Sequence, residues 1–189
     1  MSPLSQEHRV LNCGCGTQTF GDIRLDIQRT NATNIIADAQ HLPFRENAFA
    51  IVYQRNLLEH LPKPNLHLGE VHRILQPAGE LQLITDHSKC LRYRLTGSHS
   101  RYHKHAENDS QAIKYFLAGF FRRGAENGDR HYGIFTKESL RKLLESAGMR
   151  VQKLEFVDTV YFTRYLDRGL RYFKPELSYP RILVEAKRD

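Results

Sequence analysis

The chain has 189 residues, enough to bury a hydrophobic core in one domain, and its 40% hydrophobic and 26% charged content is ordinary for a soluble globular protein. No uninterrupted apolar run approaches the roughly 18 residues of a membrane span, and the first ten residues lack the apolar core of a signal peptide, so we expect a cytoplasmic protein. The formal net charge of +7 favours anionic partners without identifying one, and the odd number of cysteines, three, argues against a disulfide framework.

Four short strands are predicted in the first 53 residues. Residues 10–11 lead into a glycine-rich stretch as a short buried strand, and residues 23–27 alternate apolar and polar like a second. Residues 34–37 form a third, which ends at Asp38. The continuous apolar run 49–53 is typical of a strand buried on both faces of a parallel sheet.

Helical spacing of apolar residues predicts three helices. The first follows Pro64 and stops at the Pro-Ala-Gly sequence 77–79. The second spans 109–124, from an Asp or Ser cap to a glycine. The third starts at Thr136, has leucines at i, i+3 and i+4, and ends at Gly148.

Further strands are predicted over 80–85, 151–157 and 181–186. Strands that alternate with helices imply an α/β fold with a mostly parallel sheet, which we expect to form a single domain over residues 1–189. Ligands of such sheets bind at the carboxyl ends of the strands, near the point where strand order reverses. The residues that fall at such ends are Gly14, Asp26, Asp38 and Asp86.

Two polar segments, 86–109 and 158–176, are too long for ordinary connections and are interpreted as insertions into the core sheet. The first is rich in histidine, which leaves a metal site open, although a solvated loop explains it more simply. The second mixes arginines with tyrosines at helical spacing. That pattern fits a lid over a phosphate, an RNA or lipid surface, or an arm packed on the domain or a dimer partner.

The glycine-rich stretch excludes two common sites. A Walker loop needs Lys-Ser or Lys-Thr after its glycines, whereas Gly16 is followed by Thr17 and Gln18. Cys13 and Cys15 are separated by one residue, too few for the usual zinc pair. We therefore expect no metal here.

Residues 9–86 resemble the class I S-adenosylmethionine-dependent methyltransferases, of the small type 11-like subgroup. The parts that carry the resemblance there are, in chain order, the glycine motif 10–16, Asp26, 38–44, 49–53, 57–61 and 73–79. Residues 135–149 and the final strand also follow the usual ending of the family. One Gly-x-Gly is weak evidence, but this joint order is specific. The resemblance implies a Rossmann-like, doubly wound, mostly parallel sheet of seven strands with a shortened first crossover.

The resemblance also implies a cofactor and a reaction. Methyl transfer would use S-adenosylmethionine, leave S-adenosylhomocysteine and act on an unidentified acceptor, which we expect to be a small molecule, with anionic molecules as the first candidates. Asp26 would accept hydrogen bonds from the ribose hydroxyls, and Asp38 would meet the adenine amino group. The residues assigned to the cofactor are Asn12, Gly14, Cys15, Gly16, Asp26, Ile27, Asp38, Ala39, Gln54 and Asn56.

Three side chains are candidate proton acceptors in this reaction: Asp86, His87 and His131. The two histidines titrate near neutral pH, as a general base requires. Each histidine has a packing or surface role as its commoner alternative.

Some positions depart from the family pattern. Asn12 stands where an acid is frequent, Gln18 where a third glycine is frequent, and Ala50 where an aspartate commonly follows Phe. The stretch from Gly16 to Asp26 is also shorter than the dozen residues of a normal parallel crossover. Two alternatives therefore stay open: a binding or scaffold protein that has lost turnover, and a methyltransferase that acts on RNA. The sequence is compatible with a monomer or a homodimer.

Overall fold

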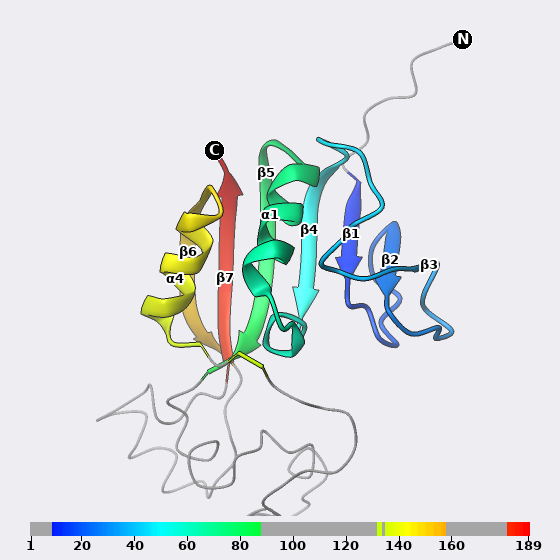
Figure 1. The fold of residues 1–189 in the computed structure, drawn as a ribbon, viewed down its shortest axis with the longest axis horizontal. Helices are drawn as coiled ribbons and strands as arrows, with labels where there is room; N and C mark the ends of the chain where they lie inside the picture. The colour runs from blue at the N-terminus through cyan, green and yellow to red at the C-terminus, as the bar shows by residue number, and fades with distance from the viewer. Residues whose placement is uncertain (1–8, 88–131, 134, 158–180) are drawn as a thin grey trace, which may run out of the picture.

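The computed structural model describes residues 9–87, 132–133, 135–157 and 181–189. Seven strands form one sheet in the order β3-β2-β1-β4-β5-β7-β6 (Figure 1). The strands are β1 (Val10–Cys13), β2 (Ile23–Asp26), β3 (Ile35–Ile36), β4 (Phe49–Arg55), β5 (Leu75–Asp86), β6 (Met149–Val157) and β7 (Arg181–Arg188). The helices are the single 3₁₀ turn η1 (Leu58–His60), α1 (Pro64–Ile74) and α4 (Lys137–Ser146). The helix predicted over 109–124, the insertion 158–176 and all but the first two residues of the insertion 86–109 lie outside the described residues.

The topology confirms the Rossmann-like prediction. Strands β1 to β5 pair in parallel, while β7 lies antiparallel between β5 and β6. Strand order reverses at β1, which pairs with β2 on one side and with β4 on the other. The carboxyl ends of β1, β2 and β4 therefore meet at the switch point, where α/β proteins of this kind bind ligands.

The first crossover is short, as predicted, and the next two also lack a helix. Residues 14–22 return from β1 to β2, residues 27–34 from β2 to β3 and residues 37–48 from β3 to β4, all without helical structure. Since these loops form no regular ladder of their own, their backbone polar groups need other partners.

The core lies between the sheet and two helices, α1 and α4, which cover the same face (Figure 1). The buried residues of the sheet that belong to this core include Leu11, Val52, Leu81, Leu83, Ile182, Val184 and Ala186. From the helices come Leu68, Val71, Ile74, Leu140 and Leu144, all fully buried. Fully burying one leucine contributes about 1.5–3 kcal/mol, so this layer dominates the stability of the fold.

The opposite face of the sheet corrects one prediction. Residues 49–53 were expected to be buried on both faces, but Ile51 and Tyr53 are only half-buried. Tyr53 lies beside Gln82, and Gln82 beside Glu185, in a polar row across β4, β5 and β7. The prediction was wrong because none of the three helix-free crossovers places a helix over this side.

The junction between α1 and β5 also differs from prediction. Strand β5 begins at Leu75, directly after the helix, because Leu75 pairs with Phe49 while the next paired residue, Glu80, faces Ile51. The Pro-Ala-Gly turn is thus a bulge inside the strand. A Cβ atom on Gly79 would lie 2.8 Å from the Gln76 carbonyl oxygen, so the bulge requires glycine.

Helix α4 follows the sequence pattern at both ends. Thr136 Oγ1 accepts from the Ser139 amide at 3.1 Å, and Ser139 Oγ accepts from the Thr136 amide at 2.9 Å, which completes a capping box. Gly148, with φ 77°, ends the helix in the left-handed conformation that glycine tolerates. In the part of the chain that the structure describes, no helix has the length and apolar character to cross a membrane.

Candidate functional site

The glycine loop lies at the carboxyl end of β1. Gly14 and Gly16 have φ values of 70° and 54°, which side chains other than glycine rarely adopt. A Cβ atom on Gly14 would lie 3.0 Å from Leu57 Cδ1, so Gly14 makes room for packing inside the protein. A Cβ atom on Gly16 would meet nothing within 4 Å. Gly16 therefore presents backbone to open space, where a ligand can approach it.

Gly16 is held from both sides. Its amide donates to Asp26 Oδ2 at 2.8 Å, and its carbonyl oxygen accepts from the Thr30 hydroxyl. Asp26 Oδ1 also accepts from the Gln28 amide at 2.9 Å. Side chains of β2 and the β2–β3 loop thus fix the loop that a crossover helix would otherwise support. A carboxylate has about four acceptor positions, so Asp26 keeps capacity for ligand hydroxyls.

Asn12 and Gln18, two of the departures from the family pattern, contact each other. Asn12 is fully buried, and its Nδ2 donates to the Phe20 carbonyl oxygen at 3.2 Å and to Gln18 Oε1 at 3.4 Å. The Phe20 ring packs edge-on against Tyr53, with centroids 5.4 Å apart. Asn12 therefore bonds to two residues of the short return to β2 and helps to fix the conformation of that loop.

The cysteines of the glycine loop are packing residues. Cys13 and Cys15 are both buried, and Cys15 Sγ lies 3.7 Å from Thr33 Oγ1. Burial, with the nearby Asp26 charge as a smaller cause, raises the pKa of the Cys13 thiol to about 12. No group of three or more metal-binding side chains that could hold an ion occurs within the described ranges.

Asp38 presents a charged carboxylate after β3. Its pKa lies below the usual value, chiefly because Oδ1 accepts from the Gln40 amide at 2.8 Å. His41 Nδ1 lies 3.3 Å from Oδ2, and the Asp38 side chain is 42% exposed. Ile27, next to Asp26, is 70% exposed. The ends of β2 and β3 thus offer two carboxylates and an accessible apolar surface.

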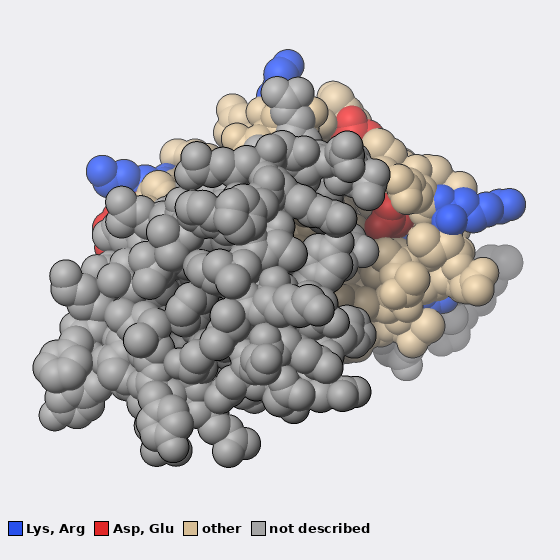
Figure 2. All heavy atoms as spheres, turned by 90° about the horizontal axis from the view of Figure 1, so that it is seen from below, with Lys and Arg blue, Asp and Glu red and all other residues tan. Residues whose placement is uncertain are grey.

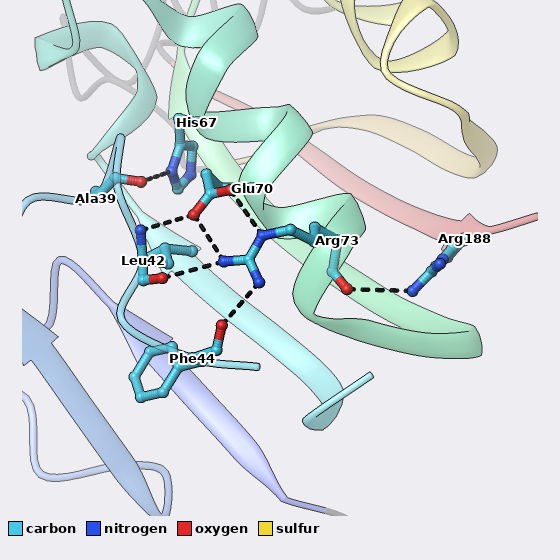
Figure 3. Close-up of polar contacts among 7 residues, drawn as sticks. All are labelled: Ala39, Leu42, Phe44, His67, Glu70, Arg73 and Arg188. Atoms are coloured by element: carbon cyan, nitrogen blue, oxygen red, sulfur yellow. Dashed lines mark hydrogen bonds and ion pairs between the residues drawn. The ribbon is translucent and has the colours of Figure 1, made fainter. Parts of the chain in front are cut away.

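The adjoining segment 39–44 is held by polar side chains of α1 (Figure 3). Glu70 Oε2 accepts from the Leu42 amide at 2.9 Å. The Arg73 guanidinium donates to the carbonyl oxygens of Phe44 at 2.7 Å and Leu42 at 3.1 Å. These contacts between α1 and residues 39–44 were not predicted from the sequence. The only sequence signal for them was the three-residue spacing of His67, Glu70 and Arg73 in a predicted helix.

His67 is the third of these side chains. It is fully buried, with Nδ1 2.8 Å from the Ala39 carbonyl oxygen and Nε2 2.5 Å from Gln54 Oε1. Burial lowers the pKa of His67 to about 4, so the ring is neutral at pH 7 and has one N–H. We assign this N–H to Nδ1, and we assign the Gln54 amide nitrogen to the position facing Nε2, since the two atoms of an amide are interchangeable in shape. The structure therefore places both Ala39 and Gln54 against His67.

The ends of β4 and β5 hold the other predicted residues. Asn56 follows β4 with φ 53°, and its amide donates to the Ile84 carbonyl oxygen at 2.8 Å. Asp86 is 3% exposed and lies 3.7 Å from Arg181 Nε of β7. The buried His87 ring packs against Phe156, with centroids 4.7 Å apart. Asp86 is thus the last residue of β5 and His87 follows it, whereas His131 is outside the described residues.

Glu59 is a second buried group that sequence analysis did not select. It is fully buried, and its Oε2 accepts from Thr85 Oγ1 at 2.8 Å. Its carbonyl oxygen accepts from the amides of Tyr132 at 2.8 Å and Gly133 at 3.1 Å. Glu59 thus ties η1 to the end of β5 and to the chain that leads into α4.

The charged side chains of the described residues do not form one patch at the carboxyl ends of the parallel strands. Figure 2 views the molecule from the carboxyl ends of the parallel strands, and there the described surface is mostly uncharged, with acidic side chains within it and Lys and Arg at its outline. Elsewhere, a shallow groove of about 460 Å³ lies between residues 40–42 and the first half of α1. Its lining does not include the glycine loop, so we place the candidate site by the geometry of Gly16 and Asp26.

Sequence comparisons find related proteins over part of the chain. Residues 21–83 match a family model described as a methyltransferase domain. An uncharacterised protein of Methanocaldococcus jannaschii is 36% identical over an alignment of 89 positions that covers 40% of this chain and 39% of that protein. The chain thus spans well under half the length of this curated relative.

Solved structures support the fold. The 1,6-didemethyltoxoflavin-N1-methyltransferase of Burkholderia thailandensis, solved with S-adenosylhomocysteine bound, is 13% identical, with a TM-score of 0.57 over 95% of this chain and 70% of that one. The [4+2]-cyclase SpnF is 17% identical, with a TM-score of 0.56 over 96% of this chain and 74% of that one. At such low identity these likenesses establish the architecture, and the second shows that the architecture also serves other chemistry.

Proposed function

We propose that the chain, which has the fold of the class I S-adenosylmethionine-dependent methyltransferases, binds S-adenosylmethionine and methylates a small-molecule acceptor. The observation that carries the proposal is Gly16. Its backbone faces open space at the switch point, and the Asp26 carboxylate lies 2.8 Å from its amide. This combination suits a ligand that has both an amino-acid part and ribose hydroxyls.

The residues present fit such a cofactor. Gly16 allows close approach of the backbone, Asp26 offers acceptors to ribose hydroxyls, and the ionised Asp38 offers an acceptor to an adenine amino group. Ile27, exposed beside Asp26, offers apolar contact to the base. When bound, S-adenosylmethionine supplies an already activated methyl group. The protein then needs mainly to align the acceptor and exclude water.

Proton removal falls to the end of β5 in this proposal. Asp86 and His87 lie there, and Arg181, 3.7 Å away, steadies the Asp86 carboxylate. We keep Asp86, His87 and His131 as the candidate bases. A small anionic acceptor is favoured by the net charge of +7.

A second function is binding, or chemistry other than methyl transfer, on the same fold. The cyclase neighbour is the observation that favours it. The departures at Asn12 and Gln18 favour it less, because the two side chains bond to each other and support the loop.

Calorimetric titration with S-adenosylmethionine and S-adenosylhomocysteine tests the proposal, after any co-purified ligand has been removed. We expect dissociation constants in the micromolar range and, in a screen with radiolabelled methyl donor, label transfer to an anionic small molecule. Binding without transfer to any acceptor would favour the second function. Transfer to RNA, with binding that weakens steeply as salt rises, would move the acceptor to nucleic acid. Absence of binding by folded protein would overturn the proposal.

A further inference from the structure

We propose that His67, Glu70 and Arg73 of α1 are positioning residues of the cofactor site, because they fix the backbone of residues 39–44 that follows Asp38. We call these three side chains the α1 clamp. The inference rests on the proposed function, since it concerns the segment that would meet the adenine of the cofactor.

The segment that follows Asp38 has no helix of its own. Residues 37–48 connect β3 to β4 without regular structure, so their amides and carbonyls need partners from elsewhere. The α1 clamp supplies them at three points: Ala39, Leu42 and Phe44. Because the clamp residues recur every three positions, one face of a single helix reaches all three points.

The hydrogen bonds of the α1 clamp are strong because two of its side chains are charged. Glu70 and Arg73 form a bidentate pair, with 2.8 Å from Nε to Oε1 and 2.8 Å from Nη2 to Oε2. This pairing lowers the pKa of Glu70 and raises that of Arg73. The two side chains are 25% and 32% exposed, so water screens the pair only partly. Charge-assisted bonds to the backbone of Leu42 and Phe44 extend from this pair.

The α1 clamp holds the backbone of residues 39–44 and leaves the Asp38 carboxylate accessible. Asp38 bonds only to its near neighbours Gln40 and His41 among the contacts described, and its side chain is 42% exposed. The first clamped residue, Ala39, is the next one in the chain. If the α1 clamp moved, the backbone at Ala39 would move with it and displace Asp38, although no hydrogen bond of Asp38 itself would break.

The helix end is fixed in turn by the last strand. Arg188 of β7 donates to the carbonyl oxygens of Arg73, at 3.3 Å, and Leu75, and to Asn47 Oδ1 at 2.6 Å. Figure 3 shows Arg188 on the side of Arg73 that lies away from Ala39, Leu42 and Phe44. Arg73 is thus held at its backbone by β7 while its side chain holds the segment.

The test compares two arginines, each in an ion pair on its own helix. Arg73→Lys keeps the charge and removes the fork that reaches both carbonyls. The matched control is Arg141→Lys on α4, where Arg141 pairs with Glu145 at 3.6 Å and both side chains are about half exposed. The dissociation constant of S-adenosylhomocysteine is measured by calorimetry at a temperature where thermal melts show every variant folded. We expect an increase of about tenfold for Arg73→Lys, about 1.4 kcal/mol, and no change for Arg141→Lys.

Hydrogen exchange of residues 38–44 separates positioning from general stability. We expect faster exchange in this segment for Arg73→Lys, with unchanged exchange in β5 and β7. Glu70→Ala, paired with Glu145→Ala as its control, gives the same comparison if Arg73→Lys does not fold. Equal affinity of the clamp variants and the wild type would overturn this inference alone. If the wild type bound no S-adenosylhomocysteine, the proposed function and this inference would both fall.

Discussion

Asp26 has two roles at the scale of single residues. Its two carboxylate oxygens accept from the amides of Gly16 and Gln28, and in the proposed function they also face ribose hydroxyls. A change at Asp26 therefore alters both the loop and the ligand contact. Replacing Asp26 with alanine would remove both the loop bonds and the ligand contact at once. Replacing it with asparagine, which has the same shape, keeps one acceptor oxygen and so separates these two effects in part.

Asp26→Asn keeps one acceptor oxygen and replaces the other with a donor. We expect the dissociation constant of S-adenosylhomocysteine to rise at least tenfold, about 1.4 kcal/mol, because the amide nitrogen cannot accept from a hydroxyl or an amide. Calorimetry measures it, with Asp189→Asn as control because Asp189 pairs only with the exposed Arg150 in the contacts described. Unchanged affinity in Asp26→Asn would remove Asp26 from the site.

His67 makes stability depend on pH. In the folded protein its pKa is about 4, against about 6.5 when unfolded. Between these values the unfolded chain binds more protons, so the free energy of unfolding rises with pH. His67 contributes up to about 3 kcal/mol, present above pH 6.5 and lost as pH falls toward 4.

Urea unfolding at several pH values between 4 and 7 checks this, with His67→Asn as the comparison. Asn can still donate to the Ala39 carbonyl oxygen but does not titrate. We expect the wild type to lose more stability than the variant as pH falls. His72, whose pKa is also lowered by burial, contributes with the same sign in both proteins and cancels. Parallel curves would contradict the assignment of a neutral His67.

The sequence predicted which single residues lie at the strand ends, but not their partners. Gly14, Asp26, Asp38 and Asp86 were selected because each follows or ends a predicted strand. The bond from Asn12 to Gln18 depends on how the nine-residue return 14–22 folds, and the bond from His67 to Ala39 joins residues 28 apart. Such contacts carry no local periodicity, so pattern analysis could not detect them.

At the scale of elements, the predictions held where local signals define an end. Thr136 and Gly148 mark the two ends of α4, and each does so through hydrogen bonds to residues only three positions away. The end of α1 was less well predicted, because the pairing of Leu75 with Phe49 decides where the strand begins. That pairing joins two strands, so the sequence of either strand alone could not predict it.

Two glycines of neighbouring elements should respond oppositely to alanine. Gly69 lies within α1 with nothing within 4 Å of an added Cβ, so Gly69→Ala should raise the free energy of unfolding by about 0.5–1 kcal/mol. Gly79→Ala places its methyl 2.8 Å and 3.1 Å from backbone oxygens of Gln76 and Ala50, and should lower it by about 1–3 kcal/mol. Denaturant unfolding measures both, and equal shifts would show that the bulge is not tightly packed.

At the scale of the whole molecule, the alternation of strands and helices predicted the class of fold and its mostly parallel sheet. Whether a strand is buried on one face or two was not predictable from the strand. The apolar run 49–53 was interpreted as buried on both faces of the sheet. Ile51 and Tyr53 are only half-buried, because α1 and α4 cover the other face. Burial of a face depends on what the rest of the chain places over it.

The position of β7 has a consequence for synthesis on the ribosome. This strand follows all the others in the chain yet lies inside the sheet, between β5 and β6. Until its residues emerge from the exit tunnel, β5 and β6 lack their shared neighbour, and the backbone groups on those edges have no ladder to join. A nascent chain that pauses before residue 181 therefore presents two open strand edges, the kind of surface that chaperones cover and that other chains can join.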